Sequence, residues 1–434
     1  MRPIDVAARL AGRRGRVLLH SGRDDDGLGT WSFAAAEPRA TLMARGRSIV
    51  RLDEHGRPAK RFTADPFDAA EEFLREHGCI LEPRADAPPE PRVFGYFGYD
   101  LARVVEQLPG GPRLGQDVPD LWLAAYDSIA RTRGDTTEVI GARWLEQVLA
   151  SGPARPGLPP RLGDLVPDDA GDLHMARVGR ILDYLAAGDV YQVNLARRLV
   201  ARIEAPGDAL ALYETLSEVA PAPYGALLEA DGVTILSGSP ERFLASVGDR
   251  VETRPIKGTR PRAPGAADEL AAAPKDDAEH LMIVDLERND LGRIAETSSV
   301  RVDELGYIVE LPALYHKVSR VSAKPRAGTG YAQLLRATFP GGSITGAPKV
   351  RAMQLIDELE PARRGPYCGA LGYFGAHGAF ELAIAIRIGV IKGHELRVHV
   401  GGGIVADSDA QAELAETEVK AAGWLATVER LRRR

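Results

Sequence analysis

The chain has 434 residues, of which 44% are hydrophobic and 27% charged, and its formal net charge is −6. This composition is typical of globular proteins, the length suits two or three domains or one large interwoven domain, and the interspersed charges give no long-range attraction to nucleic acid or anionic lipid. With only two cysteines, no signal-peptide core and no run of about 18 apolar residues, we expect a cytoplasmic protein without a disulfide framework, and neither nucleic acid nor membrane as a partner.

The first 150 residues are predicted to form one region, built mainly from antiparallel strands. Short apolar alternations separated by turn-rich segments predict strands at 16–20, 41–43 and 48–52. Residues 66–78 have helical periodicity and end at Gly78, a residue type that commonly ends helices. After a proline-rich connector, residues 94–100 form a glycine–aromatic strand whose small residues allow a neighbouring backbone or a ligand to approach closely.

A second region is predicted over residues 170–427. Residues 152–169 contain five prolines and little apolar content, which marks the clearest boundary in the chain. An amphipathic helix over 173–187 follows, and the rest alternates strands and helices of ordinary length. The sequence contains no internal repeat and no low-complexity tract.

Lys257 lies between Ile256 and a glycine in the segment Arg-Pro-Ile-Lys-Gly-Thr-Arg (254–260). Strand-like residues precede it, so the pattern predicts a turn after a hairpin, from which the lysine side chain projects. A lysine held beside apolar side chains loses hydration, which lowers its pKa and makes the amine available as a base or a nucleophile. A surface turn lysine without function is the alternative.

Two predicted helices carry acids at helical spacing. They are Asp276 and Glu279 in the helix over about 275–292, and Glu413, Glu416 and Lys420 in the helix over about 408–431. Ser408 can cap the start of the second helix. Carboxylates from two helices with open positions between them suit Mg²⁺, which prefers oxygen ligands and keeps waters for a substrate carboxylate. A solvated helix face is the alternative for each set.

Two glycine-rich segments could present backbone N–H groups to an anion. The segment 341–349 precedes a predicted helix, although its spacing is not that of a Walker A loop. The second segment follows a strand over 396–400 and could hold a carboxylate. Its glycines are Gly401, Gly402 and Gly403.

Arg387 places a charge in the otherwise apolar alternating strand predicted over 383–389. A buried arginine needs a partner, and a ligand carboxylate could pair with it through two parallel hydrogen bonds. An internal salt bridge is the alternative.

Six segments, by their order and spacing, resemble the chorismate-utilising enzyme family. They are 188–195 (Gly-Asp-Val-Tyr-Gln-Val-Asn-Leu), 239–243 (Ser-Pro-Glu-Arg-Phe), 255–262 (Pro-Ile-Lys-Gly-Thr-Arg-Pro-Arg), 279–290 (Glu-His-Leu-Met-Ile-Val-Asp-Leu-Glu-Arg-Asn-Asp), 342–349 (Gly-Ser-Ile-Thr-Gly-Ala-Pro-Lys) and 401–408 (Gly-Gly-Gly-Ile-Val-Ala-Asp-Ser). The match covers roughly residues 170–425, and Phe-Gly-Tyr-Asp at 97–100 extends it weakly toward the N-terminus. Lysine in the third segment is typical of members that aminate chorismate at C4, whereas anthranilate-forming members usually carry alanine.

The resemblance implies an anthranilate synthase component I-like fold of the α+β class. In this fold, antiparallel sheets pack face to face with helices outside, and the site lies in a cleft between the halves. It also implies Mg²⁺ as the cofactor, ligated by Glu279 and Glu416, with Asp276 and Glu413 supporting through water. The residues that it implies around chorismate are Arg387, Tyr373, Thr345, Gly401, Gly402, Gly403, Lys420 and Gln192, with His316 beside the ring.

The resemblance also suggests roles in the chemistry. Lys257 is the amine that could add at C2 of chorismate and expel the C4 hydroxyl before ammonia adds at C4, and whether it bonds covalently or acts only as a base stays open. Glu241 resembles the general acid for the departing hydroxyl. Gln192 stands where members that activate water carry lysine, so hydroxylation at C2 is disfavoured. We find no segment typical of a glutamine amidotransferase, so ammonia is expected from such a partner subunit or from free ammonium.

The expected function is synthesis of 4-amino-4-deoxychorismate for p-aminobenzoate and folate. One alternative is another chorismate-aminating enzyme of the family, which makes anthranilate or aminodeoxyisochorismate. The other is a non-catalytic protein that senses chorismate or tryptophan, against which the full set of candidate catalytic and metal residues argues. Residues 18–21 (Leu-Leu-His-Ser) only partly resemble the family's Leu-Leu-Glu-Ser element, because His20 stands where glutamate is expected. We therefore predict no feedback inhibition by tryptophan.

Overall fold

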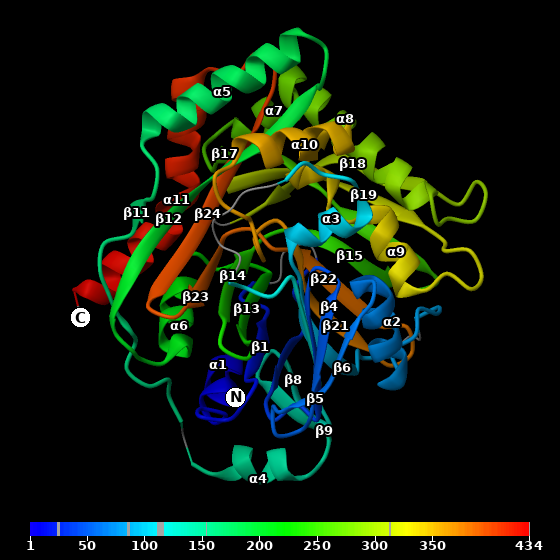
Figure 1. Cartoon of the computed structure of the whole chain (residues 1–434), viewed down its shortest axis with the longest axis vertical. Coiled ribbons are helices and arrows are strands. Elements are labelled where there is room, and N and C mark those ends of the chain that lie inside the picture. Colours follow the sequence, from blue (N-terminus) through cyan, green and yellow to red (C-terminus); the bar gives the residue numbers. More distant parts are fainter. Residues whose placement is uncertain (24–26, 85–86, 111–116, 153, 312–313, 434) are drawn as a thin grey trace.

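The computed structural model describes residues 1–23, 27–84, 87–110, 117–152, 154–311 and 314–433, without the side chains of residues 274–276. Two twelve-stranded antiparallel sheets form the centre of the molecule, and helices lie around them (Figure 1). This confirms the expected α+β class, with sheets packed face to face and helices outside. Within the described ranges, no helix is long and apolar enough to cross a membrane.

The first sheet joins strands from both ends of the sequence. Its order is β10 (Arg161–Leu162), β12 (Gln192–Ala205), β24 (Glu395–Ile404), β23 (Ile388–Lys392), β14 (Thr234–Ser239), β13 (Tyr224–Glu229), β1 (Val17–His20), β2 (Ser32–Ala35), β8 (Ser128–Arg133) and β9 (Thr136–Gly141), while β11 (Val166–Pro167) and β20 (Gly346–Ala347) also pair with β12. The helices that pack on these strands are α1 (Pro3–Ala8), α4 (Trp144–Ala150), α5 (Gly171–Ala186), α6 (Ala209–Val219), α10 (Lys349–Leu359) and α11 (Ala410–Arg432).

The second sheet is assembled in the same mixed way. Its order is β17 (Ile256–Pro261), β19 (Leu314–Ala323), β16 (Arg250–Arg254), β15 (Arg242–Val247), β22 (Phe380–Ile384), β21 (Ala370–Gly375), β6 (Pro91–Phe97), β7 (Leu121–Ala125), β3 (Ala40–Arg45), β4 (Ser48–Leu52) and β5 (Pro58–Thr63), while β18 (Arg301–Glu310) pairs with β19. The helices on this side are α2 (Pro66–Glu76), α7 (Ala266–Ala271), α8 (Pro274–Gly292) and α9 (Tyr331–Thr338). The remaining short pieces are η1 (Tyr99–Leu101), α3 (Ala102–Val105) and η2 (Gly342–Ile344).

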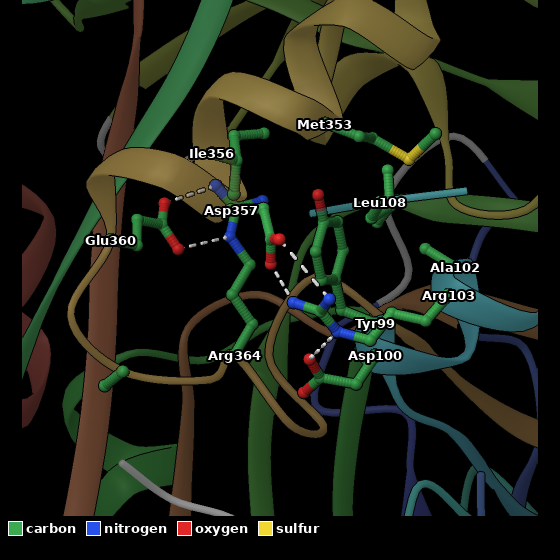
Figure 2. Close-up of a pocket in the computed structure, with 11 residues that line it drawn as sticks. Tyr99, Asp100, Ala102, Arg103, Leu108, Met353, Ile356, Asp357, Glu360 and Arg364 are labelled. Carbon is green, nitrogen blue, oxygen red and sulfur yellow. Dashed lines mark hydrogen bonds and ion pairs between the residues drawn. The ribbon is translucent and has the colours of Figure 1, made fainter. Parts of the chain in front are cut away.

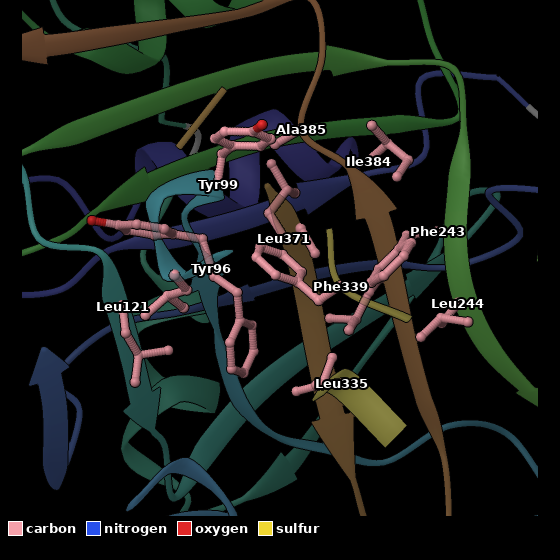
Figure 3. Close-up of a cluster of buried hydrophobic side chains, with 14 of the residues drawn as sticks. Tyr96, Tyr99, Leu121, Phe243, Leu244, Leu335, Phe339, Leu371, Ile384 and Ala385 are labelled. Carbon is pink, nitrogen blue, oxygen red and sulfur yellow. The ribbon is translucent and has the colours of Figure 1, made fainter. Parts of the chain in front are cut away.

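Side chains of the first sheet alternate between two hydrophobic cores. In β1, Val17 belongs to the central core shared by the two sheets, whereas Leu18 belongs to the core beneath the outer helices, as the two-residue period of a strand requires. Phe33 of β2 reaches the second sheet, where the ring centres of Phe94 and Tyr373 lie 6.3 and 5.1 Å from its own. Figure 3 shows another part of the central core, in which aromatic and aliphatic side chains from distant parts of the sequence pack together.

The two predicted regions, 1–150 and 170–427, contribute strands to both sheets. In the first sheet β1 pairs with β13, with Val17 opposite Leu228, and in the second sheet β6 pairs with β21, with Phe97 opposite Ala370. The regions therefore share one central core, and the position of the boundary between them stays a prediction.

The long helices begin and end close to where the sequence predicts them. The helix predicted over 66–78 spans Pro66–Glu76, and Gly78 follows it with a left-handed φ of 72°. The predictions over 173–187, about 275–292 and about 408–431 correspond to α5, α8 and α11. The prediction that Ser408 caps α11 is wrong, because the carboxylate of Asp409 accepts the hydrogen bond from the backbone N–H of Ala412.

Candidate active site

Lys257 lies within strand β17, at the edge of the second sheet, and the prediction of a turn is therefore wrong. β17 pairs with β19, and the register shifts between Lys257 and Thr259, so that Gly258 forms a bulge with a φ of 76°. Such a bulge needs a residue that adopts a left-handed conformation and re-aims the neighbouring side chain. The amine of Lys257 lies 3.4 Å from the carbonyl oxygen of Ser343, in the turn before α10.

Glu241 lies in the connection between β14 and β15, and only 6% of its surface is exposed. Burial raises the pKa of its carboxyl group, while hydrogen bonds from the Ser343 hydroxyl and the Ile256 backbone N–H, together with the charge of Lys257, act in the opposite direction. The pKa of Lys257 is lowered, mainly by burial and also by Lys420. An amine with a lowered pKa and an acid with a raised pKa are thus neighbours, which is how an active site prepares a nucleophile and a proton donor.

His316 lies on β19 directly opposite Thr259, and its Nδ1 is 2.8 Å from the Thr259 hydroxyl. Burial lowers the pKa of His316 to about 4, and the positive charges of Arg387 and Arg23 lower it further. The ring is therefore neutral near neutral pH and can act as a hydrogen-bonding group beside the strand that carries Lys257.

Arg387 does not lie in a strand, because β22 ends at Ile384 and β23 begins at Ile388. It adopts a left-handed φ of 52°, and its side chain is exposed, contrary to the buried strand position that the sequence predicts. A left-handed residue other than glycine is uncommon, and a strained backbone of this kind recurs at functional sites. Within the described residues its guanidinium forms no salt bridge. The carboxylate of Glu241 is the charged group that raises the pKa of Arg387.

The glycines 401–403 lie inside β24 and not after it, paired with residues 194–196 of β12. A Cβ atom on Gly402 would lie 3.3 Å from a carboxylate oxygen of Glu413 and 3.4 Å from one of Glu416. A Cβ atom on Gly403 would lie 2.7 Å from the side-chain nitrogen of Gln192. The absent side chains therefore let the acids of α11 and the Gln192 amide approach this strand.

Gln192, at the start of β12, is fully buried. Neither its amide nitrogen nor its amide oxygen has a hydrogen-bond partner among the described residues. A buried amide without partners is costly, so this side chain indicates a place where a ligand or water would be hydrogen-bonded.

The face of α11 toward β24 carries the predicted acids and a lysine. The amine of Lys420 lies 2.5 Å from a carboxylate oxygen of Glu416 and 2.8 Å from the carbonyl oxygen of Gly401. Glu413 accepts a 2.6 Å hydrogen bond from Ser408. The predicted pairing of these residues on one helix face is confirmed.

The negative charges of Glu279 on α8 and Glu416 on α11 both raise the pKa of Lys257, so two helices bring acids toward one amine. All-oxygen donors of this kind fit Mg²⁺. Among the described residues, however, no three acidic, histidine or cysteine side chains are gathered closely enough to hold a metal ion. The side chain of Asp276, the fourth predicted acid, lies outside the described part of the structure.

Two further predicted substrate residues have their own contacts, Thr345 within the turn that carries Ser343 and Tyr373 in another cavity. The Thr345 hydroxyl is fully buried and donates to the carbonyl oxygens of Gly341 and Gly342, so it holds the turn together. Tyr373 lines a different cavity between the sheets, with Leu19, His20, Ser21 and Trp31 among its other walls.

Sequence reasoning did not single out Ser343 and Asn194. Ser343 contacts both Lys257 and Glu241, and the side-chain amide of Asn194 donates to the Ser343 carbonyl oxygen at 2.8 Å. Both lie inside quoted segments, but neither is charged, and only the folded chain brings these segments together.

A lysine and a glutamic acid with shifted pKa values lie near acids, an exposed arginine and glycine backbone, an arrangement typical of enzyme sites for small anionic substrates. The model of one protein family, described as chorismate binding enzyme, matches residues 22–426, and the chain belongs to this family.

Similar proteins agree with this membership. The chain is 39% identical to aminodeoxychorismate synthase component 1 of Klebsiella aerogenes, over 92% of this chain and 91% of the relative. It is 39% identical to anthranilate synthase component 1 of Thermus thermophilus, over 85% of this chain and 83% of the relative. Its fold matches the crystal structure of anthranilate synthase component I from Streptococcus pneumoniae TIGR4, with a TM-score of 0.79 and 30% identity over 91% of this chain and 92% of that chain.

Proposed function

We propose that the protein aminates chorismate at C4 to form 4-amino-4-deoxychorismate for p-aminobenzoate and folate synthesis. The observation that carries this proposal is the position of Lys257 beside the buried carboxyl group of Glu241. Sequence identity does not separate this reaction from anthranilate synthesis, because one relative of each kind is 39% identical. The lysine separates them, since anthranilate-forming members of the family usually carry alanine at its position.

The chemistry follows from the two neighbouring groups. The neutral amine of Lys257 adds at C2 of chorismate, the ring double bonds shift, and the C4–O bond breaks as Glu241 donates its proton, so water leaves. Ammonia then adds at C4, the double bonds shift back, and the C2–N bond to the lysine breaks. A proton from the new C4 ammonium group returns to Glu241. Chorismate and ammonia thus give the amino product and water, and both residues return to their starting states.

The remaining residues of the site suit the two carboxylates of the substrate. Arg387 and Lys420 supply positive charge, and the backbone of Gly401, Gly402 and Gly403 allows close approach. Gln192 offers an amide in place of a base, which favours amination over hydroxylation at C2.

Mg²⁺ is part of the proposal. Glu279 and Glu416 would hold it, and Glu413 and Asp276 would assist through water. When bound, the ion would neutralise a substrate carboxylate. Ammonia would come from a glutamine amidotransferase partner, in keeping with relatives named as component 1.

The test is incubation of the purified protein with chorismate, ammonium and Mg²⁺, with the products separated by chromatography and identified by mass. We expect 4-amino-4-deoxychorismate from the wild type and from Lys392→Ala, a control that removes a half-buried lysine on β23, whose amine donates to the carbonyl oxygen of Gly232. Lys257→Ala is expected to lose this product.

Each other outcome points to a different function. Anthranilate from the wild type would show the sister reaction, and retained amination by Lys257→Ala with anthranilate as the product would do the same. Chorismate binding without turnover, even with a glutaminase supplied, would favour the sensing alternative.

A further inference from the structure

Hydrogen bonds from several elements hold the turn formed by residues 341–345 in place. The backbone N–H of Gly342 donates to Glu287 of α8 at 3.0 Å, and the Thr345 hydroxyl closes the turn onto the carbonyl oxygen of Gly341 at 3.0 Å. Asn194 of β12 donates through its side chain to the Ser343 carbonyl oxygen at 2.8 Å. With hydrogen bonds to α8, to β12 and within itself, the turn is more rigid than an isolated turn would be.

A buried ion pair also holds this turn in place. Arg364 and Glu360 are 3% and 5% exposed, and the guanidinium contacts both carboxylate oxygens, at 2.7 and 3.0 Å (Figure 2). Arg364 also donates to the carbonyl oxygen of Ile344 at 2.9 Å and to that of Asn194 at 2.8 Å. Glu360 accepts the backbone N–H of Ala196 at 2.8 Å. The pair therefore ties the turn to strand β12.

Ser343 is the residue of this turn that touches both proposed reacting groups. Its carbonyl oxygen lies 3.4 Å from the Lys257 amine, and its hydroxyl hydrogen-bonds to the Glu241 carboxyl group. Only 6% of Ser343 is exposed, so water does not easily replace either contact.

We propose that Ser343 is a positioning residue, whose carbonyl oxygen orients the Lys257 amine and whose hydroxyl orients the Glu241 carboxyl group. This inference rests on the proposed roles of Lys257 and Glu241. A neutral amine that donates one N–H to a fixed carbonyl has its lone pair directed elsewhere, and a fixed hydroxyl keeps the acid from rotating away. Ser343 thus sets the spacing between nucleophile and acid without contacting the substrate.

Removal of the hydroxyl also has an electrostatic consequence. The hydrogen bond from Ser343 favours the charged form of Glu241, so its loss raises the pKa of that carboxyl group. Glu241 then carries less negative charge, which otherwise stabilises the Lys257 ammonium ion, and the pKa of Lys257 falls. Among the described residues, the other charged or titratable groups that interact with this pair are Glu279, Glu416, Lys420, His280, Glu287, Cys368 and Arg387, and the variant below leaves all of them unchanged.

The test compares Ser343→Ala with the wild type by labelling Lys257 with acetic anhydride at a series of pH values and measuring the extent by mass spectrometry. We expect the labelling midpoint of Lys257 to move to lower pH by about half a unit or more. In the amination assay we expect kcat to fall by about tenfold or more, with the KM for chorismate nearly unchanged.

Two further variants complete the test. Ser246→Ala removes a similarly buried hydroxyl from β15, where it hydrogen-bonds to the backbone of Phe380, and this variant should keep the wild-type midpoint. Ser343→Thr retains a hydroxyl, so the labelling midpoint of Lys257 in this variant should equal that of the wild type. A wild-type midpoint in Ser343→Ala, or a rise in KM alone, would overturn the role of Ser343. Because labelling needs no chorismate, this result is independent of whether the proposed reaction is correct.

Discussion

The amine of Lys420 lies 2.5 Å from the Glu416 carboxylate, one turn earlier on the same helix. One of the two carboxylates proposed to ligate Mg²⁺ is therefore already paired with a positive charge of its own chain. A metal ion held by Glu416 would compete with Lys420 for this carboxylate, and a substrate carboxylate could pair with the ammonium group in its place. Metal and substrate binding are thereby expected to favour each other.

Lys420→Met should bind Mg²⁺ more tightly than the wild type when chorismate is absent. An exposed ion pair of this kind contributes up to about 1 kcal/mol, which corresponds to about a fivefold lower Kd for Mg²⁺. The KM for chorismate should rise, because a cation is lost from the substrate site. Calorimetric titration with Mg²⁺ and steady-state kinetics measure the two effects, with Lys392→Met as the control. Weaker Mg²⁺ binding by Lys420→Met would contradict this account.

Glu279→Gln should abolish amination by weakening the metal site, without unfolding the protein. We expect activity at limiting Mg²⁺ to fall by about 100-fold, and the free energy of unfolding to change by no more than about 0.5 kcal/mol. The matched control is Asp285→Asn on the same helix, whose exposed carboxylate pairs with Arg288. Normal turnover by Glu279→Gln at limiting Mg²⁺ would remove the metal assignment.

Buried histidines should make the protein less stable in mild acid. Burial lowers the pKa of His174, His280 and His316 to about 4 and that of His399 to about 3, whereas the unfolded chain binds these protons near the usual value of about 6.5. Below that pH the unfolded state binds more protons than the folded state. The stability is therefore complete above about pH 6.5 and is lost as the pH falls toward 4, by about 1.4 kcal/mol per pH unit and per histidine.

Urea unfolding at about pH 7 and about pH 5 measures this loss. In His399→Asn the free energy of unfolding should depend less on pH, by the contribution of one histidine. Both ring nitrogens of His399 lack a hydrogen-bond partner among the described residues. The control is His55→Asn, a change at an exposed histidine. An equal pH dependence in His399→Asn and the wild type would show that His399 does not titrate as expected.

Tryptophan is predicted not to inhibit the enzyme. His20 replaces the expected glutamate, its Nδ1 lies 3.0 Å from the Tyr213 hydroxyl, and burial lowers its pKa to about 4. The neutral ring therefore offers no negative charge to the ammonium group of an amino acid. Calorimetric titration should detect no tryptophan binding, whereas His20→Glu would supply the missing carboxylate. A Kd on the order of micromolar for the wild type would refute the prediction.

Phe33→Ala should destabilise the protein by about 3–5 kcal/mol, because Phe33 is buried where the two sheets meet. The control is Tyr191→Ala, a change at an aromatic residue that is 70% exposed, for which a change within about 0.5 kcal/mol is expected. Chemical denaturation of both variants measures the difference. Equal stability of the two would mean that the contact between the sheets contributes little.

Local sequence patterns predict the helices well, because the periodicity of a helix and the residues that begin and end it lie close together in the sequence. The failures at Lys257 and Arg387 have a different origin. Proline and glycine around Lys257 resemble a turn, but β19, some sixty residues further along, pairs with this segment and converts Gly258 into a bulge. Arg387 interrupts an apolar alternation that reads as one strand, and its left-handed backbone is not visible in residue types.

The order of strands in the sheets and the role of Ser343 depend on contacts between distant segments. The resemblance to a family supplied the general arrangement, but not the individual hydrogen bonds around an uncharged serine. Glu416 can be singled out because it is an acid at helical spacing with Glu413, whereas Glu241 is proposed only through the resemblance. A serine is common in turns for purely local reasons, so only its neighbours in the fold distinguish it.

Strands from the first 150 residues pair with strands from the second region, and this pairing affects how the chain folds during synthesis. During synthesis the hydrogen-bonding edge of β6 stays open until residues 370–375 have left the ribosome, since Phe97 pairs with Ala370. Open strand edges attract other chains, and pairing over such separations is slow. A fragment cut within 152–169 would expose the partner edges of β1 and β6 together. Such halves should be insoluble when expressed alone and should regain activity only when they fold together.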